Sequence, residues 1–531
     1  MELLRRQCKQ VWYADDATGC DKFEKMRAWF DVLLKKGPIY GYFPKPSKCI
    51  LVAKPDRLEH AKNVFKGSGI DVQTEGSKDT GIEIITEGTR HLGAAVGTTE
   101  FKRSYVQKKV DNWIAAVKKL AQIAASEPHA AYSAYTQCLQ GQWTFVCRSM
   151  PAAVDLFQPL EDEIRNTFIP TLLKRAVNDL ERELLSLPVR LGGMGIFKPT
   201  EECQVAHFNS VYVSAPLVKL ICRQISEFNP HELSTEIKTL RAATDAHAEL
   251  RYKDKRDKLM GLASDVMKIA LKAAGEKGAS SWMTAVPSYD HGTILHKGDF
   301  IDACYMRYGW ELLDLPLSCI CGAPYSLQHA LDCQTGGLRQ IQHNEVRDVI
   351  AQVMREAGHT AVETEPKLQP LSGEEFDYAS ANKKPEARSD IKCCSFWSNL
   401  RQAFFDIKVV SPFARSYARL KTAQLYKQSE GAKIREYRER ILNVEHGDFT
   451  PLVFTCTGGI APQSHYVLKK LAERLSEKQN ISESVVSGWL RCRISFALLR
   501  TTLLCVRATR RKKVYVDNNI ELAVSDTRLD Y

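Results

Sequence analysis

The chain has 531 residues, a length that corresponds to about three to five compact units, and its ordinary apolar content and negative mean hydropathy exclude a disordered chain. No run approaches the roughly 18–20 apolar residues of a membrane span, so no membrane partner is expected. Lys and Arg number 74 against 63 Asp and Glu, and the net charge of +11 favours a phosphate-rich partner such as DNA or RNA.

The first informative stretch is Tyr13-Ala14-Asp15-Asp16. The β-branched and aromatic residues before it and the small residues after it predict a strand, a tight turn and a returning strand or helix. Two adjacent carboxylates repel each other unless a cation lies between them, and Mg²⁺ prefers carboxylate ligands together with substrate phosphates. A solvated Asp-Asp turn is the alternative.

This tetrapeptide resembles the YxDD motif in the palm of reverse transcriptases, and two later segments extend the resemblance. Lys48 stands where these enzymes have a lysine thought to protonate the leaving pyrophosphate, and the stretch 90–97 resembles the primer-grip strand. The resemblance implies that residues 1–100 are the C-terminal part of an α+β palm, with Asp15 and Asp16 as catalytic Mg²⁺ ligands and Lys48 as a catalytic acid. The alternative is that Lys48 is a basic residue before a strand and has no catalytic role.

The resemblance also implies missing parts. A polymerase site needs a third carboxylate from an upstream strand and fingers that hold the nucleotide, and only fourteen residues precede Asp15. We therefore expect an N-terminally truncated fragment that does not synthesise DNA alone.

Residues 101–185 are predicted to be helical, because Val106, Val110, Trp113 and Val117 recur at helical spacing with lysines on other faces. A basic helical stretch directly after a primer grip resembles a polymerase thumb; an ordinary helical domain with solvated lysines fits equally well. Residues 186–316 are predicted to be mostly helical and resemble the linker of retrotransposon proteins. The glycine-rich segment 187–196 lacks the spacing of a phosphate-binding loop.

Three of the sixteen cysteines cluster with one histidine as C-x-C-x7-H-x3-C: Cys319, Cys321, His329 and Cys333. Such ligands can close one structural tetrahedral zinc site. Buried thiols beside an incidental histidine are the alternative. The scattered cysteines show no secreted-type framework, which indicates a nuclear or cytoplasmic, reducing compartment. A CCHC knuckle, here 317–334, just before a nuclease is also the order found in retrotransposons with a restriction-like endonuclease.

Residues 335–480 are predicted to follow the order α-β-β-β-α-β of an α/β restriction-endonuclease-like core. Asp406 and Lys408 are two apart in a strand and so point to one face, and Asp390 can lie beside them on the neighbouring strand. Two carboxylates there bind Mg²⁺, while the lysine neutralises charge and helps orient or deprotonate the attacking water. Glu345 on the first helix is a further catalytic candidate, as a third metal ligand.

This constellation resembles the PD-(D/E)XK nuclease pattern, with Ser389 in place of the usual proline. A bare D-x15-DxK also occurs often by chance. The next helix offers candidates for backbone phosphate contacts, and a solvated face is equally consistent with each one: Lys427, Lys433, Arg435 and Tyr437.

Residues 481–531 are predicted to form a C-terminal helix and a basic tail, with the run 507–513 as a nuclear localisation signal or nucleic-acid tail. The whole chain resembles the C-terminal part of a non-LTR retrotransposon protein, a multidomain reverse transcriptase that nicks DNA and primes synthesis from the nick. The implied cofactors are Mg²⁺ and one Zn²⁺. The alternatives are a catalytically decayed zinc-dependent nucleic-acid-binding protein, and a product that folds poorly because its palm sheet has an exposed edge.

Overall fold

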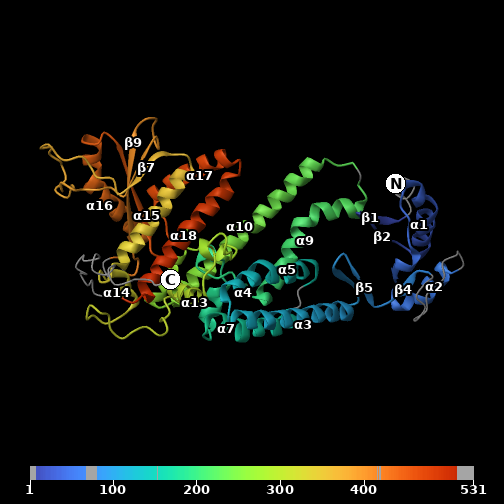
Figure 1. Ribbon diagram of the computed structural model, residues 1–531. Helices are drawn as coiled ribbons and strands as arrows, with labels where there is room; N and C mark the ends of the chain where they lie inside the picture. The colour runs from blue at the N-terminus through green and yellow to red at the C-terminus, as the bar shows by residue number, and fades with distance from the viewer. Residues whose placement is uncertain are drawn as a thin grey trace, which may run out of the picture.

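The computed structural model describes residues 8–66, 81–151, 154–225, 227–414, 417 and 420–510 (Figure 1). Over these residues the protein is multidomain and mostly helical, with one four-stranded sheet and three two-stranded sheets. This agrees with the expected combination of helical units and small sheets. One hydrophobic cluster runs from Ala95 to Val506, so the central helices and the C-terminal sheet share a core.

The N-terminal unit contains three strand pairs. Its elements are β1 (Lys9–Tyr13), β2 (Asp16–Cys20), α1 (Phe23–Lys36), β3 (Ile50–Val52), α2 (Leu58–Phe65), β4 (Glu83–Ile85), β5 (Gly88–His91) and β6 (Ala94–Gly97). β1 and β2 form the hairpin that the sequence predicts, β3 runs parallel to β4, and β5 and β6 form a second hairpin. Within the described residues the three pairs do not join, so a continuous palm sheet is not seen there.

The central part of the chain is helical. Its helices are α3 (Thr99–Ala124), α4 (Pro128–Ala134), α5 (Gln140–Ser149), α6 (Val154–Glu163), α7 (Ile169–Leu173), α8 (Asp179–Ser186), α9 (Pro199–Arg223), α10 (Pro230–Leu262), α11 (Asp265–Ala274), α12 (Ser281–Thr284) and α13 (Lys297–Tyr308). The long helix α3 begins where the Thr98 side chain accepts a hydrogen bond from the Phe101 N–H. Its face toward the core carries Trp113, which lies edge-on to Trp143 of α5 at 5.9 Å.

A buried ion pair fixes α8 against α6. The Arg182 guanidinium donates to both carboxylate oxygens of Glu161, at 2.7 and 2.8 Å, and to the Ile196 carbonyl at 2.8 Å. The side chains of Arg182 and Glu161 are only 2% and 6% exposed. A charge at such depth is tolerated only with its partner, because burial removes its hydration.

Replacing Glu161 with alanine is therefore expected to lower the free energy of unfolding by about 3–5 kcal/mol, since it leaves the Arg182 charge buried and unpaired. Urea denaturation followed by circular dichroism measures this loss. Asp155→Ala, which breaks the solvent-exposed pair between Arg103 and Asp155, is the matched control and should have little effect. Equal losses in the two variants would contradict the importance of the buried pair.

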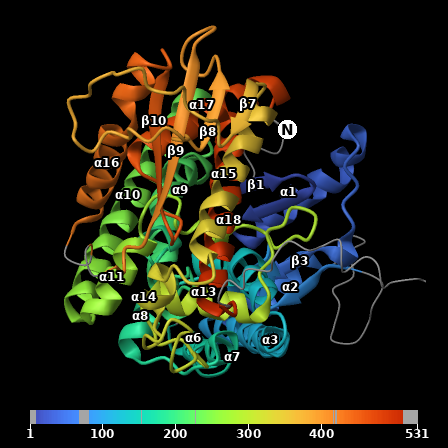
Figure 2. The ribbon, with the colours of Figure 1, turned by 60° about the vertical axis from the view of Figure 1, so that its left-hand side comes forward.

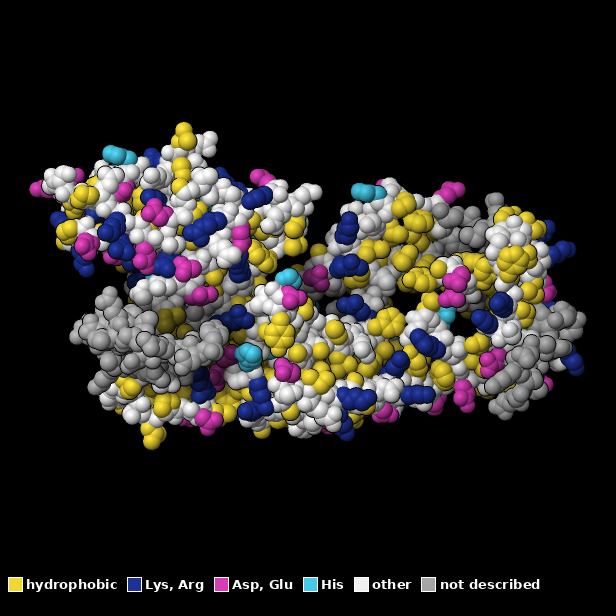
Figure 3. Space-filling view, in the orientation of Figure 1, with side chains coloured by type: hydrophobic (Ala, Val, Ile, Leu, Met, Phe, Trp, Pro, Cys, Tyr) yellow, Lys and Arg dark blue, Asp and Glu magenta, His cyan; other side chains and the backbone are white. Residues whose placement is uncertain are grey.

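The second half of α9 projects as an apolar arm. Phe208, Val211 and Tyr212 are 69%, 55% and 44% exposed, and hydrophobic side chains lie at the surface over this arm in Figure 3. In the described part of the chain, α9 is the one helix that is long and apolar enough to cross a membrane, with mean hydropathy 1.3 over an 18-residue window that is not buried. The expectation that no run approaches a membrane span was wrong for α9, because uncharged polar residues such as Ser214 interrupt the run without lowering its mean hydropathy below that of a span.

The tip of α9 covers part of the β1 edge. The Gln224 side-chain amide donates to the Gln10 carbonyl at 3.0 Å, and its oxygen accepts from the Gln10 N–H at 3.4 Å. Gln224 adopts the left-handed conformation, with φ of 52°, which turns the chain out of the helix. A side-chain amide thus takes the place of a neighbouring strand on the edge that the sequence predicts to be exposed.

The C-terminal half places a mixed sheet between helices. Its elements are α14 (Leu327–Asp332), α15 (Leu338–Glu356), β7 (Thr360–Thr364), β8 (Ile391–Cys394), β9 (Gln402–Val410), α16 (Thr422–Asn443), β10 (Asp448–Thr455), α17 (Pro462–Gln479) and α18 (Glu483–Arg507). The strand order is β10-β9-β8-β7; β9 and β10 are parallel, and the other neighbours are antiparallel. From α15 to β10, the elements follow the α-β-β-β-α-β order predicted for residues 335–480. Figure 2 shows the sheet between α16 and α15.

Helix α18 ties the C-terminal half together, because it packs along α15 and α17 and also contacts α12, α13 and α14. The basic run after it begins inside the fold. Arg507 makes a two-pronged ion pair with Asp302, at 2.5 and 2.6 Å, and Arg510 is 5% exposed. These two side chains are therefore structural, and the rest of the run, residues 511–513, lies outside the described residues.

Candidate active site and metal centre

Two carboxylates of the C-terminal sheet lie beside each other. Asp390 directly precedes β8, and its N–H donates to the Phe405 carbonyl of β9 at 3.2 Å. One Asp390 oxygen also accepts from the Ile407 N–H at 2.5 Å, which places this carboxylate next to Asp406 in the middle of β9. Asp406 is 3% exposed.

Asp406 and Lys408 share the face of β9 that α16 covers. On this face Phe404 packs against Tyr437 and Ile441 of α16, and Val410 packs with Leu425. The intervening side chains of β9 point instead into the main core: Phe405, Ile407 and Val409. The alternation of a strand therefore brings the predicted acid and lysine together beneath α16.

Each carboxylate has a cationic partner. Lys433 of α16 lies 2.8 Å from one oxygen of Asp406 and 3.3 Å from Glu436, while His343 of α15 lies 2.9 Å from the free oxygen of Asp390. Lys433 was predicted only as a phosphate contact, and His343 was not singled out.

The electrostatics of the site follow from burial and proximity. Burial, followed by the charge of Asp390, raises the pKa of Asp406 to about 7, although Lys433 opposes the shift. Burial and the Lys433 charge lower the pKa of Lys408. Burial disfavours the His343 imidazolium, but the hydrogen bond to Asp390 and the two carboxylate charges outweigh it, so the pKa of His343 is raised.

A pocket of about 400 Å³ opens at this point of the sheet. It is lined by Arg339, Gln342, His343, Ile407, Lys408, Val409, Lys433 and Glu436. Four of these side chains are basic and one is acidic. The two aspartates lie behind this lining, where His343 contacts Asp390 and Lys433 contacts Asp406. The basic lining is suited to a phosphate group.

Glu345 does not lie in this pocket. Its side chain is exposed on α15 and is not part of the pocket lining. Glu345 is two residues from His343, which is about 200° around a helix. The apolar face of α15 carries Val346 and Ile350, and His343 continues that face at the i−3 position. The three-residue spacing from His343 to Val346 is the feature of the sequence that could have predicted an inward-facing His343.

The four predicted zinc ligands converge. The ligand atoms of Cys319, Cys321, His329 and Cys333 all lie within 4.8 Å of one another, with 3.9 Å between the sulfurs of Cys319 and Cys333 and 3.3 Å from the Cys321 sulfur to Nε2 of His329. Zn–S and Zn–N bonds of about 2.3 and 2.0–2.1 Å in a tetrahedron separate ligand atoms by about 3.5–3.8 Å. The cluster could therefore bind a metal ion such as zinc.

Local structure explains this convergence. Gly322 has φ of 89° and donates to the Cys319 carbonyl at 2.8 Å, which makes the tight turn between the first two ligands. Ser326 caps α14 by accepting from the His329 N–H at 3.1 Å. The Cys333 N–H donates to the His329 carbonyl at 2.8 Å, so the last two ligands face the turn together, as their spacing predicts.

The two N-terminal aspartates occupy an exposed hairpin tip. Asp15 and Asp16 follow Ala14, which has φ of 52°, and both are exposed, as is Lys48. Among the described residues no third acid, histidine or cysteine joins the two aspartates as a metal-binding group, and Lys48 makes no ion pair with them. Thr18 of β2 contacts His91 of β5 at 3.4 Å, so the hairpin lies against the predicted primer-grip segment.

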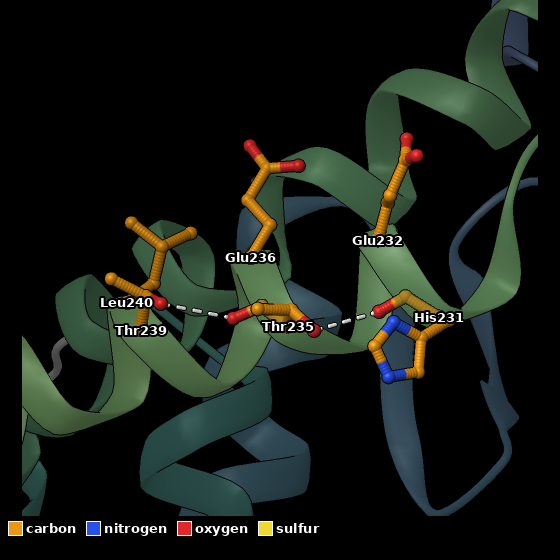
Figure 4. Close-up of a pocket in the computed structure, with 6 residues that line it drawn as sticks. All are labelled: His231, Glu232, Thr235, Glu236, Thr239 and Leu240. Carbon is orange, nitrogen blue, oxygen red and sulfur yellow. Dashed lines mark hydrogen bonds between the residues drawn. The ribbon is translucent and has the colours of Figure 1, made fainter.

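A larger hollow lies along α10 but gathers no site. Figure 4 shows that its lining residues come from one helix: His231, Glu232, Thr235, Glu236, Thr239 and Leu240. The threonine hydroxyls donate to carbonyls of the same helix, at 2.9 and 3.0 Å, and the two glutamates point away from the histidine. Among the residues that the structure describes, no side chain from a second element lines this hollow.

Comparison with known proteins adds no assignment. No protein-family model matches the chain, and no curated protein matches it.

Proposed function

We propose that the protein is a Mg²⁺-dependent DNA endonuclease whose site consists of Asp390, Asp406 and Lys408. The observation that carries the proposal is the buried Asp406 beside Asp390, at a pocket lined by Lys408 and further bases. Carboxylate oxygens are the ligands that Mg²⁺ prefers, and a basic pocket favours a phosphodiester. The family interpretation, a C-terminal fragment of a retrotransposon reverse transcriptase that meets DNA and RNA in the nucleus or cytoplasm, stays a proposal based on resemblance.

Each residue has a role in this proposal. Asp390 and Asp406 would hold the cation, which supplies charge stabilisation for the developing negative charge on the phosphate. The lowered pKa of Lys408 leaves a larger fraction of its amine neutral than in an ordinary lysine, and only the neutral amine can accept a proton from the attacking water. Lys433, released from Asp406 when a cation takes its place, can neutralise a phosphate oxygen in the same pocket.

A catalytically decayed, zinc-dependent nucleic-acid-binding protein is the second candidate. It is favoured by the ion pair between Lys433 and Asp406 and by the contact between His343 and Asp390, because both carboxylates are already engaged by the protein's own bases. The N-terminal hairpin is proposed to be a palm remnant that does not synthesise DNA, since Asp15 and Asp16 have no third ligand in the described part of the chain.

The pH dependence of nicking separates the two candidates. Metal binding requires the ionised carboxylate, and the pKa of Asp406 is raised to about 7, so a proton competes with the cation below that pH. At limiting Mg²⁺, the rate of nicking of supercoiled DNA is expected to rise as the pH increases through about 7, and excess Mg²⁺ should move this rise to lower pH. Absence of Mg²⁺-dependent nicking across this range would support the binding protein.

A further inference from the structure

Arg339 at the start of α15 joins the metal cluster to the basic pocket. Its guanidinium donates to the Leu331 carbonyl of α14 at 2.6 Å and to the Val409 carbonyl of β9 at 3.3 Å. Leu331 lies between the metal ligands His329 and Cys333, and Val409 directly follows Lys408. One side chain thus touches backbone next to both sites.

Arg339 also lines the pocket itself. A guanidinium has five N–H donors in a fixed plane, and the two carbonyls use only part of this set. The remaining donors are available to the pocket, and an arginine fork matches the oxygens of a phosphate. The two carbonyls fix the plane of the fork before a ligand arrives, so little side-chain entropy is lost on binding.

The position of the Leu331 carbonyl depends on the metal cluster. Helix α14 has only six residues, too few to persist without external support. Two metal ligands, His329 and Cys333, lie on either side of Leu331, and they are linked by the hydrogen bond between their backbones at 2.8 Å. A metal ion held by the four ligands would therefore fix the acceptor that orients Arg339.

We propose that Arg339 is a phosphate-positioning residue of the pocket and that the metal cluster orients it, so that zinc binding and DNA binding strengthen each other. This inference rests on the proposed function, because it assigns the pocket to nucleic-acid phosphate. It does not require catalysis. Coupling of two binding equilibria is reciprocal: the factor by which zinc raises DNA affinity equals the factor by which DNA raises zinc affinity.

The test uses the full chain with Asp406→Asn, so that cleavage does not interfere. Fluorescence anisotropy with a short labelled duplex gives DNA affinity with zinc bound and after chelation, and a chromophoric chelator gives zinc affinity with and without the duplex. We expect each ligand to raise the affinity of the other by about tenfold. Adding Arg339→Gln should remove this coupling while the protein still binds one zinc ion, and Arg438→Gln, an exposed arginine on α16, is the matched control.

If the zinc-free chain unfolds, the coupling cannot be measured by chelation. The DNA affinity of the zinc-loaded Arg339→Gln protein is then compared with that of the zinc-loaded parent. This variant should bind DNA about tenfold more weakly than the parent at an unchanged melting temperature. Tight DNA binding with no coupling, or unchanged affinity in Arg339→Gln, would overturn the inference and leave the nuclease proposal standing. Failure of the parent chain to bind DNA at all would overturn both.

Discussion

Asp406→Asn is expected to lower the rate of Mg²⁺-dependent nicking by a factor of roughly 10² to 10³, because the loss of one carboxylate ligand removes charge stabilisation worth several kcal/mol at the phosphate. The substitution keeps the size of the side chain, so the packing of β9 beneath α16 should be preserved. It also removes one of the two carboxylate partners of Lys433 and leaves only Glu436, so the ammonium is more available to a phosphate. DNA binding without Mg²⁺ should therefore be unchanged or stronger, and a nicking assay together with a gel-shift assay measures the two effects.

The control is Asp448→Asn, in the neighbouring strand β10. Asp448 pairs with Arg401, and β10 runs parallel to β9. Asp448 lies opposite Ala403 in the register, three residues before Asp406, and contacts neither Asp390 nor Lys433 within the described residues, so this variant should nick at the parental rate. Nicking by Asp406→Asn at the rate of the Asp448→Asn control would remove Asp406 from the site and leave the binding-protein alternative.

The ion pair between Lys433 and Asp406 has a consequence for cation affinity. A buried carboxylate needs a positive neighbour, and Lys433 supplies one at 2.8 Å without any bound cation. A divalent cation must displace this ammonium, which lowers the apparent affinity of the site for Mg²⁺. The ammonium then remains in the pocket beside Glu436 and Lys408, where a phosphate oxygen can take the place of Asp406.

Local patterns in the sequence were enough to predict the parts of the site that depend on short-range geometry. The two-residue period of a strand places Asp406 and Lys408 on one face of β9, and four ligands within fifteen residues can close a metal cluster without distant contacts. Much of the element order of residues 335–480 was likewise predictable, because β9 and β10 are mostly apolar runs and α15 carries apolar residues at helical spacing.

The other features depend on contacts between distant segments. The sequence did not predict His343, because carboxylates are the expected Mg²⁺ ligands and Glu345 is the nearest carboxylate on this helix. Glu345 lies off the apolar face of α15. The bridge from Gln224 to Gln10 joins residues 214 apart, and no periodicity predicts such a contact. The strands of the N-terminal unit have only three to five residues, and so few backbone pairs do not specify how they combine into a sheet.

Loss of the metal cluster is expected to lower the melting temperature by about 5–10 °C. This is the shift that a fall of about 2–4 kcal/mol in the free energy of unfolding produces in a domain of about 150–250 residues. Metal binding to such ligands contributes directly to folding free energy. Here α14 and Tyr325, two residues before it, also anchor the end of α18: the Tyr325 hydroxyl donates to the Val506 carbonyl at 2.6 Å, and Arg510 donates to the Ala330 carbonyl of α14 at 2.8 Å. Because α18 packs along α15 and α17, loosening its end weakens the helices around the sheet.

Cys333→Ser tests this expectation, with Cys222→Ser, an exposed cysteine at the end of α9, as the control. The parent and the control should each contain one zinc ion per chain. When a chelator is added, the melting temperature of each should fall by about 5–10 °C. Cys333→Ser should contain none, should melt at the temperature of the chelated parent, and should not respond to the chelator. A parent protein that purifies without zinc, or a Cys333→Ser variant that still responds to the chelator, would show that the four side chains meet without holding a metal. In that case Arg339 would take its orientation from β9 alone.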